Sequence, residues 1–494
     1  MGEACNRSAG RRAFPSGEQA GRPNIGVARR PVGSTMAVAG VMAIWASVAP
    51  AETMQSALIK AYQNNPQLNA QRATARSIDE NVPQALSGYR PKISVTAGAS
   101  EQYTSLTSKT PSPVNPTQPA YFNAANFLTP WTVGITGTQT LFNGFQTANR
   151  TRAAESQVSG AREALRVMEQ TILLSAATAY MDVLRDTANL EVQRSNVRVL
   201  QETLKQTRDR FDVGEVTRTD VAQAEAQLAA GQSAELAAES TLTTSKANYR
   251  QIILVEPVNL APGSPVDRFF PRTLSASIDL GLTENPSVTS AMYGVDVSFL
   301  QVKINEGALL PVVSAQISAQ ELSEPVVGLT TEFLATAAAN VTIPIYQGGS
   351  EYSLIRQSKE GLGQQRLTLD LTRNQVRQAV VQAWGQLEAA KAQVVAAQSQ
   401  VTSSEVALNG VREEARVGQR TTLDVLNAQQ ALVNARVALV TAQHDRVVAS
   451  YSVLSAVGRL SPQVLGLPTA VYDPMIHYQQ VRDAWIGVRN PDGR

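Results

Sequence analysis

Few side chains in this sequence have the chemistry of a catalytic or metal-binding site. The 494 residues contain one cysteine, Cys5, and two histidines, His444 and His477. Cys5 precedes an expected leader, so the mature chain should carry neither a disulfide nor a thiolate metal site. The histidines are far apart in the sequence, and we expect His444 to lie on the solvated face of a helix. These residues therefore predict no metal site.

No other pattern predicts catalysis or nucleic-acid binding. Glycines recur in the segment GSEYSLIRQSKEGLG, 349–363, but without the spacing of a phosphate-binding loop. We find no nucleophile paired with a general base. The formal net charge is only +2, whereas a nucleic-acid-binding domain shows a basic stripe. We therefore predict a protein that is not an enzyme, holds no cofactor and binds no nucleic acid.

The most informative spacing occurs in two similar turns. The stretch DRFDVGEVTRTDVAQAEAQL, 209–228, is echoed by EEARVGQRTTLDVLNAQQAL, 413–432. In each stretch Val-Gly interrupts a helical pattern, and glycine favours the left-handed conformation that ends a helix. A Thr-x-x-Asp capping-box spacing then predicts the start of the next helix, with Asp in place of the usual Glu: Thr217 with Asp220, and Thr421 with Asp424.

Both turns belong to two copies of one larger unit. NNPQL at 64–68 is echoed by ENPSV at 284–288, 220 residues later. LFNGF at 141–145 is echoed by IYQGG at 345–349, only 204 residues later. The first copy therefore carries 16 extra residues, which we place in the Pro-rich segment 108–121 and interpret as an exposed loop.

The N-terminus has the pattern of a secretory signal. An apolar run follows Arg29 and Arg30 and ends in the A-x-A pattern at 49–51. This run is too short to span a bilayer, which needs ~20 apolar residues. We therefore divide the chain into four regions: the leader with its signal peptide at 1–51, the first repeat at 52–265, the second repeat at 266–467, and a C-terminal tail at 468–494.

Each repeat predicts a short helix and a long helical hairpin. Proline-free runs extend over 146–210 and 350–417, with apolar residues every seven positions, as in a coiled coil. At 1.5 Å per residue, a helix of ~66 residues is ~100 Å long. The return helix at 217–254 and the short helix at 66–90 together match this length. We therefore expect them to stack end to end beside the long helix.

Each repeat also predicts two strands, because apolar residues alternate with Thr, Ser or Gln. The expected strands lie at about 92–104, 129–142, 311–322 and 334–346. Four strands leave open edges, which a membrane does not tolerate. Three chains supply twelve strands, enough to close a barrel with an apolar outer face and a polar lumen.

These features together resemble the TolC family of outer-membrane efflux and type I secretion channels. The resemblance extends over about 52–490. It depends on the twofold repeat, the NNP and ENP starts, and VGQRTTLDVLNAQ with its weaker twin VGEVTRTDVAQA. The segment GLPTAVYDPMIHYQQVRDAWIG, near the C-terminus, is similar to the alphaproteobacterial secretion branch of the family.

The resemblance implies an α+β membrane protein, a homotrimer with a 12-stranded β-barrel in outer-membrane lipids and a long α-helical tunnel in the periplasm, where the tail also lies. It implies two partners, a periplasmic adaptor (membrane fusion protein) and an inner-membrane ABC or RND transporter. The cargo stays open between proteins, by type I secretion, and small toxic compounds. A periplasmic adaptor or another structural coiled-coil protein of the cell envelope is the alternative.

The resemblance also assigns roles to the turns. In the family each turn is a periplasmic tip that meets the adaptor, which implies docking contacts by Val213, Gly214, Thr217, Val417, Gly418 and Thr421. Asp424, repeated by threefold symmetry, would form an acidic ring that favours cations at the tunnel entrance. Arg420 is implied to bond Asp220 in the closed state. Ala415 replaces the Tyr of this latch and Asn427 replaces a second acid of the ring, so both should be weaker here.

Overall fold

The computed structural model describes residues 52–491, except 112–113, 115–116 and 327. The expected leader at 1–51 lies outside the described residues. In the first repeat the elements follow in this order: α1 (Met54–Asn64), α2 (Pro66–Asp79), α3 (Asn81–Leu86), η1 (Ser87–Tyr89), β1 (Lys92–Ala99), β2 (Gln102–Pro111), β3 (Pro119–Leu128), β4 (Trp131–Asn143), α4 (Gln146–Asp212) and α5 (Arg218–Ile253).

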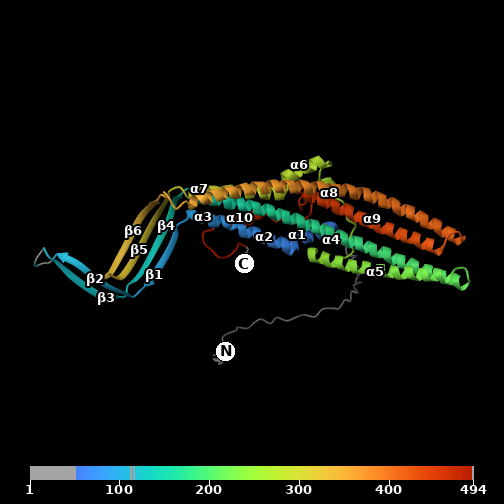
Figure 1. Cartoon of the computed structure of the whole chain (residues 1–494), viewed down its shortest axis with the longest axis horizontal. Coiled ribbons are helices and arrows are strands. Elements are labelled where there is room, and N and C mark those ends of the chain that lie inside the picture. The colour runs from blue at the N-terminus through green and yellow to red at the C-terminus, as the bar shows by residue number, and fades with distance from the viewer. Residues whose placement is uncertain (1–51, 112–113, 115–116, 327, 492–494) are drawn as a thin grey trace, which may run out of the picture. The chain divides into compact units, whose positions relative to one another are not determined.

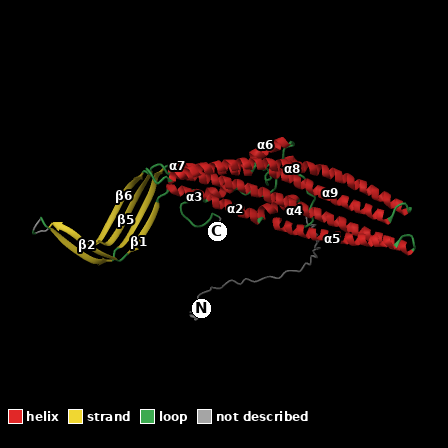
Figure 2. Ribbon diagram, in the orientation of Figure 1, coloured by secondary structure: helices red, strands yellow, loops and turns green. Residues whose placement is uncertain are grey.

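The second repeat has the same plan but lacks a counterpart of the strand pair β2 and β3 (Figure 2). Its elements are η2 (Asp267–Phe269), α6 (Leu274–Glu284), α7 (Pro286–Gly307), β5 (Val312–Val326), β6 (Leu329–Thr342), α8 (Ser350–Arg416) and α9 (Thr422–Ala456), and α10 (Pro474–Val481) follows. The two expected long helices are therefore confirmed as α4 and α8, each of 67 residues. None of the described helices combines the length and hydropathy needed to cross a lipid bilayer.

In each repeat, one asparagine side chain joins the return helix to the short helix. Asn65 Oδ1 accepts the amide two residues ahead at 2.9 Å and caps α2, while Asn65 Nδ2 donates to the carbonyl of Ile252 in α5 at 3.0 Å. Asn285 caps α7 in the same way, and its Nδ2 donates to the carbonyl of Ala456 in α9 at 2.9 Å. The Asn-Pro of the repeated NNP and ENP segments thus serves a junction between helices.

The junctions confirm the expected end-to-end stacking. Figure 1 shows α5 followed in line by α1 and α2 beside α4, and α9 followed by α7 beside α8. The short helix expected at 66–90 is interrupted, because α2 gives way to α3 and η1. Helices α1 and α6, which precede the two asparagines, are additions to the predicted plan.

The core follows the seven-residue apolar spacing. Buried side chains at that spacing are Val183, Leu190, Val197 and Leu204 in α4, and Leu387, Val401 and Leu408 in α8. Larger side chains are buried where α1, α4 and α5 meet: Tyr62, Tyr180 and Tyr249. Thin helical seams with few aromatic residues therefore form most of the core, as the composition suggested.

Strands β1, β4, β5 and β6 form one antiparallel sheet, in the order β1-β4-β5-β6. One row across it pairs Val95 with Ile135, Ile135 with Ala319, and Ala319 with Ala335. Neighbouring rows alternate between faces. The apolar face comprises Ile93, Val95 and Ala97, then Trp131, Val133 and Ile135, then Ala315, Ile317 and Ala319, then Phe333, Ala335 and Ala337.

The opposite face of this sheet is lined mainly by Thr, Ser and Gln, and Gln139 and Glu321 interrupt the apolar face towards its two ends. Within the described chain, β1 and β6 each pair on one side only. The expected strand pairs and their alternation are thus confirmed, with both edges of the sheet left unpaired.

The number of strands predicted per repeat was wrong for the first repeat. The segment 108–121, expected as an exposed loop, contributes to β2 and β3, which pair from Gln102 with Leu128 to Pro111 with Pro119. This hairpin continues the ladder of β1 and β4 without a change of register, and Ser100 N donates to the carbonyl of Pro130 at 2.9 Å between the two ladders. The described chain therefore has six strands.

The sheet and the helices meet where two glycines touch. Gly144, with φ of +64°, precedes α4, and Gly307 ends α7. A Cβ atom on either residue would overlap the carbonyl oxygen of the other. Only glycine lets the two backbones approach this closely.

The C-terminal tail is anchored on the first repeat. His477 in α10 lies 2.9 Å from Asp79 Oδ2 in α2. The Arg162 guanidinium lies over the Tyr478 ring, 4.9 Å from its centroid. Further along, Arg90 donates to the carbonyl of Ala484 at 2.6 Å. The tail therefore packs on both α2 and α4.

The glycine contact predicts the effect of a single methyl group. Gly307→Ala should destabilise the protein by about 1–3 kcal/mol, because the two backbones must separate to admit the Cβ atom. The measurement is thermal unfolding in detergent, followed by circular dichroism. Gly410→Ala in α8 is the matched control, since nothing lies within 4 Å of its Cβ position and Ala favours a helix. Equal unfolding temperatures for both variants would contradict the prediction.

Candidate functional site at the hairpin tips

Both long helices end in the same hydrogen-bonded cap. After α4, Gly214 N donates to the carbonyl of Phe211 and Glu215 N to that of Arg210, each at 2.9 Å. After α8, Gly418 N donates to the carbonyl of Ala415 at 3.2 Å, and the following amide donates to that of Glu414 at 2.9 Å. These pairs form Schellman motifs, which require a left-handed residue. The φ angles of the two glycines, +81° and +79°, satisfy that requirement.

Each tip continues into a capping box. Asp424 Oδ2 accepts the amide of Thr421 at 3.0 Å and its hydroxyl at 2.9 Å, and Asp424 N donates back to Thr421 Oγ1 at 3.2 Å. Asp220 Oδ2 accepts the amide of Thr217 at 2.9 Å and its hydroxyl at 2.7 Å. The predicted Thr-x-x-Asp spacing therefore caps α5 and α9, and Asp replaces Glu without loss of the reciprocal contact.

These contacts keep both carboxylates ionised. The hydroxyl and the amide of Thr217 lower the pKa of Asp220. The amide of Thr421, followed by its hydroxyl, lowers the pKa of Asp424. Each contribution to stability is present above the ordinary Asp pKa and is lost only as the pH falls through the lowered value. The carboxylates of Asp220 and Asp424 are therefore both negatively charged at neutral pH.

Arg420 lies at the second tip but does not meet Asp220 within one chain. Its Nε donates to Glu414 Oε2 at 2.9 Å, and both side chains are about half exposed. Asp220 is bound to Thr217 of its own tip. Sequence reasoning missed Glu414, although its place six residues before Arg420, across the turn, was available as a signal. A contact between Arg420 and Asp220 stays a prediction for the assembled protein.

The tips also present apolar side chains. Val213 is 72% exposed and Val417 is 71% exposed. No atom lies within 4 Å of the Cβ position of Gly214 or Gly418. Each tip therefore combines a capped helix end, an ionised Asp and an uncovered valine, an arrangement that can bind a partner surface but contains no nucleophile.

The expectation for His444 was wrong. Its side chain is buried between α9 and α4 rather than solvated, and its Nε2 lies 3.0 Å from Asp182 Oδ1. The available signal was its place seven residues before the buried Tyr451 and three before the buried Val447, on the apolar stripe of α9. Among the described residues, no group of three or more His, Cys, Asp or Glu side chains is placed to hold a metal ion.

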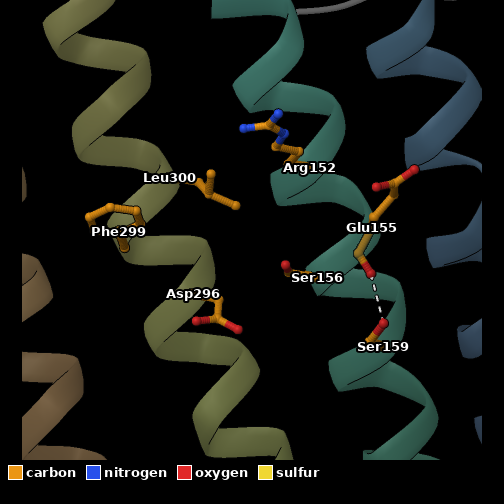
Figure 3. A pocket seen from close by; sticks show the side chains of 7 residues that line it. All are labelled: Arg152, Glu155, Ser156, Ser159, Asp296, Phe299 and Leu300. Carbon is orange, nitrogen blue, oxygen red and sulfur yellow. Dashed lines mark hydrogen bonds between the residues drawn. The ribbon is translucent and has the colours of Figure 1, made fainter.

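A hollow of about 410 Å³ lies between α4 and α7 (Figure 3). Its polar lining includes Arg152, Glu155 and Asp296, while Phe299 and Leu300 provide an apolar wall. Ser159 Oγ donates to the backbone carbonyl of Glu155 at 3.0 Å, so this hydroxyl is not paired with a general base. The lining residues therefore form no catalytic constellation.

Known sequences resemble most of this chain. The family model described as outer membrane efflux protein matches residues 57–253 and 278–459. The outer membrane efflux protein BepC of Brucella suis is 44% identical over 445 residues, which cover 90% of this chain and 93% of BepC. The alkaline protease secretion protein AprF of Pseudomonas aeruginosa is 26% identical over 323 residues, which cover 63% of this chain and 66% of AprF.

Solved structures share the fold. The CmeC outer membrane channel of Campylobacter jejuni superposes with a TM-score of 0.69 at 17% identity, over 87% of this chain and 89% of CmeC. The outer membrane protein VceC of Vibrio cholerae gives a TM-score of 0.68 at 17% identity, over 82% of this chain and 96% of VceC. The helical hairpins and the four-stranded sheet thus have counterparts of known structure.

Proposed function

The chain belongs to the outer membrane efflux protein family, and from this premise we propose that it is the outer-membrane channel of a tripartite export system. Three chains close one barrel, and their helices form a tunnel in the periplasm. A periplasmic adaptor and an inner-membrane transporter of the ABC or RND class deliver the cargo to this tunnel. Family membership argues against the alternative of a periplasmic adaptor.

One observation carries the proposal: the sheet has an apolar face, a polar face and two unpaired edges. Backbone groups at an open edge are not viable in lipid, where each must find a partner. Pairing of β6 in one copy with β1 in the next removes every edge of this sheet when three copies meet. The apolar face then contacts lipid and the polar face lines a wet lumen.

The cargo classes follow from the relatives. BepC is named as an efflux protein and AprF as a protease secretion protein. We propose that the channel passes small toxic compounds, proteins secreted by the type I route, or both. A passive conduit for such different cargo needs no catalytic residue, because the transporter supplies the energy.

Electrophoresis tests the assembly. Outer-membrane fractions run without heating should contain a band near three times the mass of the mature chain, which is below the 52.9 kDa of the full chain because the leader is removed. Boiling should convert this band to the monomer. The physical reason is that a closed barrel has no unpaired strand edge at which detergent could separate the chains. A soluble monomer that fractionates with periplasmic proteins would refute the proposal.

We propose that Asp424, Arg420 and Asp220 form the gate at the periplasmic entrance. The capping contacts keep Asp424 ionised, so threefold symmetry produces a ring of negative charge there. Arg420 is held by Glu414 in the single chain and is free to exchange this exposed partner for Asp220 of a neighbouring tip, since exposed ion pairs contribute little.

The gate proposal predicts changes in single-channel recordings. Asp424→Asn should reduce cation preference and block by divalent cations, because the ring loses its charge. Arg420→Ser should raise the conductance, because one arm of the latch is removed. Glu413→Ala is the matched control, since Glu413 is an exposed acid at the same tip and is paired with Arg416. If Asp424→Asn behaves as Glu413→Ala does, the ring plays no part.

We propose that the tips dock the adaptor through Val213, Gly214 and Thr217, and through Val417, Gly418 and Thr421. The uncovered valines provide apolar area at the end of each hairpin. The left-handed glycines add no side chain next to these valines, and no other atom lies within 4 Å of either Cβ position.

A bulky side chain at the second tip tests the docking. Gly418→Trp should raise ethidium accumulation in cells that carry the adaptor and transporter, because the indole blocks contact, while unheated trimers persist. Gly418→Ala is the control, since it imposes the same backbone strain at φ of +79° without the bulk. Normal export by Gly418→Trp would exclude a docking role for this tip.

A further inference from the structure

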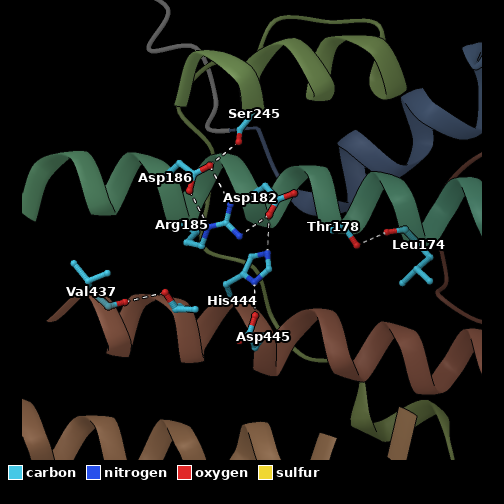
Figure 4. A network of polar contacts seen from close by, with 10 residues as sticks. Leu174, Thr178, Asp182, Arg185, Asp186, Ser245, Val437, His444 and Asp445 are labelled. Carbon is cyan, nitrogen blue, oxygen red and sulfur yellow. Dashed lines mark hydrogen bonds and ion pairs between the residues drawn. The ribbon is translucent and has the colours of Figure 1, made fainter. Parts of the chain in front are cut away.

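A buried polar cluster links the hairpin of the first repeat to that of the second (Figure 4). His444 of α9 lies between two carboxylates: its Nε2 is 3.0 Å from Asp182 Oδ1 of α4, and its Nδ1 is 2.8 Å from Asp445 Oδ1. Arg185 of α4 contacts both Asp182, at 2.9 Å, and Asp186, at 2.8 Å. His444 is only 7% exposed, so these partners rather than water surround its ring.

The geometry has a direct consequence for the protonation of the ring. A neutral imidazole carries one N–H group and can donate to only one carboxylate, whereas an imidazolium donates from both nitrogens. His444 Nδ1 is hydrogen-bonded with Asp445 Oδ1 at 2.8 Å, whereas Nε2 is buried and lies at an ion-pair distance of 3.0 Å from Asp182 Oδ1 without the geometry of a hydrogen bond. In the neutral form, a lone pair would therefore face Asp182 or Asp445. The arrangement fits the protonated form.

The surrounding charges favour the same form. Three carboxylates face one guanidinium in the cluster: Asp182, Asp186 and Asp445 against Arg185. From α5, Ser245 contributes only a hydroxyl, which donates to Asp186 Oδ2 at 2.5 Å. A proton on the buried His444 therefore reduces an excess of negative charge among carboxylates of which Asp186 is buried and Asp445 is about half exposed.

Other elements around α9 bring no competing charge to the ring. In α8, residues 392–404 contain no charged side chain. On either side of this stretch, Lys391 is paired with Glu388 and Glu405 is paired with Arg436. Arg446 is engaged with Asp267 of η2. The groups that decide the charge of His444 are therefore those of the cluster.

We propose that His444 is a proton-operated clamp between the two hairpins of each chain. Protonation ties α9 to α4 through the ion pair between the imidazolium and Asp182, and loss of the proton removes the positive charge from that pair. Burial of the ring lowers its pKa, but the nearby carboxylates of Asp182 and Asp445 outweigh burial and leave the pKa of His444 above its ordinary value. The stabilisation is therefore complete in acid, below the ordinary pKa of His, ~6.5, and is lost as the pH rises through the raised value.

The chain offers a clean test, because it contains only two histidines. In the purified mature protein, His444→Gln should unfold at least about 2 °C below the wild type at pH 5.5, and the difference should vanish at pH 8.5. His477→Gln is the matched control, and its unfolding temperature should change between pH 5.5 and pH 8.5 as that of the wild type does. A difference between wild type and His444→Gln that is equal at every pH would overturn the proposal, as would loss of the pH dependence in His477→Gln alone.

A second variant keeps the test decisive if His444→Gln folds poorly. Asp445→Asn removes one carboxylate, so the ring needs only one N–H donor and its charged form loses support. The midpoint of the pH-dependent stabilisation should therefore move to lower pH. An unchanged midpoint would contradict the proposal.

A distance measurement tests the clamp itself. Labels on Glu215→Cys and Gln419→Cys report the separation of the two tips of one chain when the labelled chain is co-expressed with an excess of the cysteine-free mature wild type, so that most trimers carry one labelled copy. Spin-label distances should be narrowly distributed at pH 5.5 and broader at pH 8.5. With His444→Gln added, the distribution should be broad at both values. Distances that do not respond to pH in the wild type would overturn the proposal.

Discussion

The arrangement of the helices depends on two asparagine side chains that each serve two helix ends. Asn65 caps α2 and donates to a carbonyl at the C-terminal end of α5, and Asn285 caps α7 and donates to a carbonyl at the C-terminal end of α9. A helix end leaves unpaired N–H and C=O groups, which are costly to bury. One amide group satisfies both kinds, so two short helices continue in one line beside a long helix without a gap in hydrogen bonding.

That junction lies between the sheet at one end of each hairpin and the turn at the other. Because the stacked helices match α4 and α8 in length, each hairpin is ~100 Å long and closes only at its Gly-Thr turn. The other ends converge on the sheet, where Gly144 and Gly307 allow close backbone contact. The same helical frame therefore carries the sheet at one end and the charged, apolar-tipped turns at the other.

Much of the frame and the tips was predictable, because it follows from local rules. The seven-residue apolar spacing predicted both long helices, and the alternation of apolar and polar residues predicted β1, β4, β5 and β6. The Thr-x-x-Asp spacing predicted the caps of α5 and α9. The β2–β3 hairpin was missed because prolines normally indicate a loop; here Pro111 and Pro119 face each other at its end, where missing N–H donors cost little. The partner of Arg420 was also missed, since Glu414 reaches it only across the folded turn.

The sequence by itself determined the repeat, the helix ends and the two faces of the sheet, because each depends on residues close together in the chain. Tertiary structure alone decided the surroundings of His444, whose carboxylate partner Asp182 lies in the other repeat. We expected a solvated histidine, although its place on the apolar stripe of α9 indicates burial. The charged partner Asp182 comes from packing of α9 on α4, a contact between distant segments that no local spacing encodes.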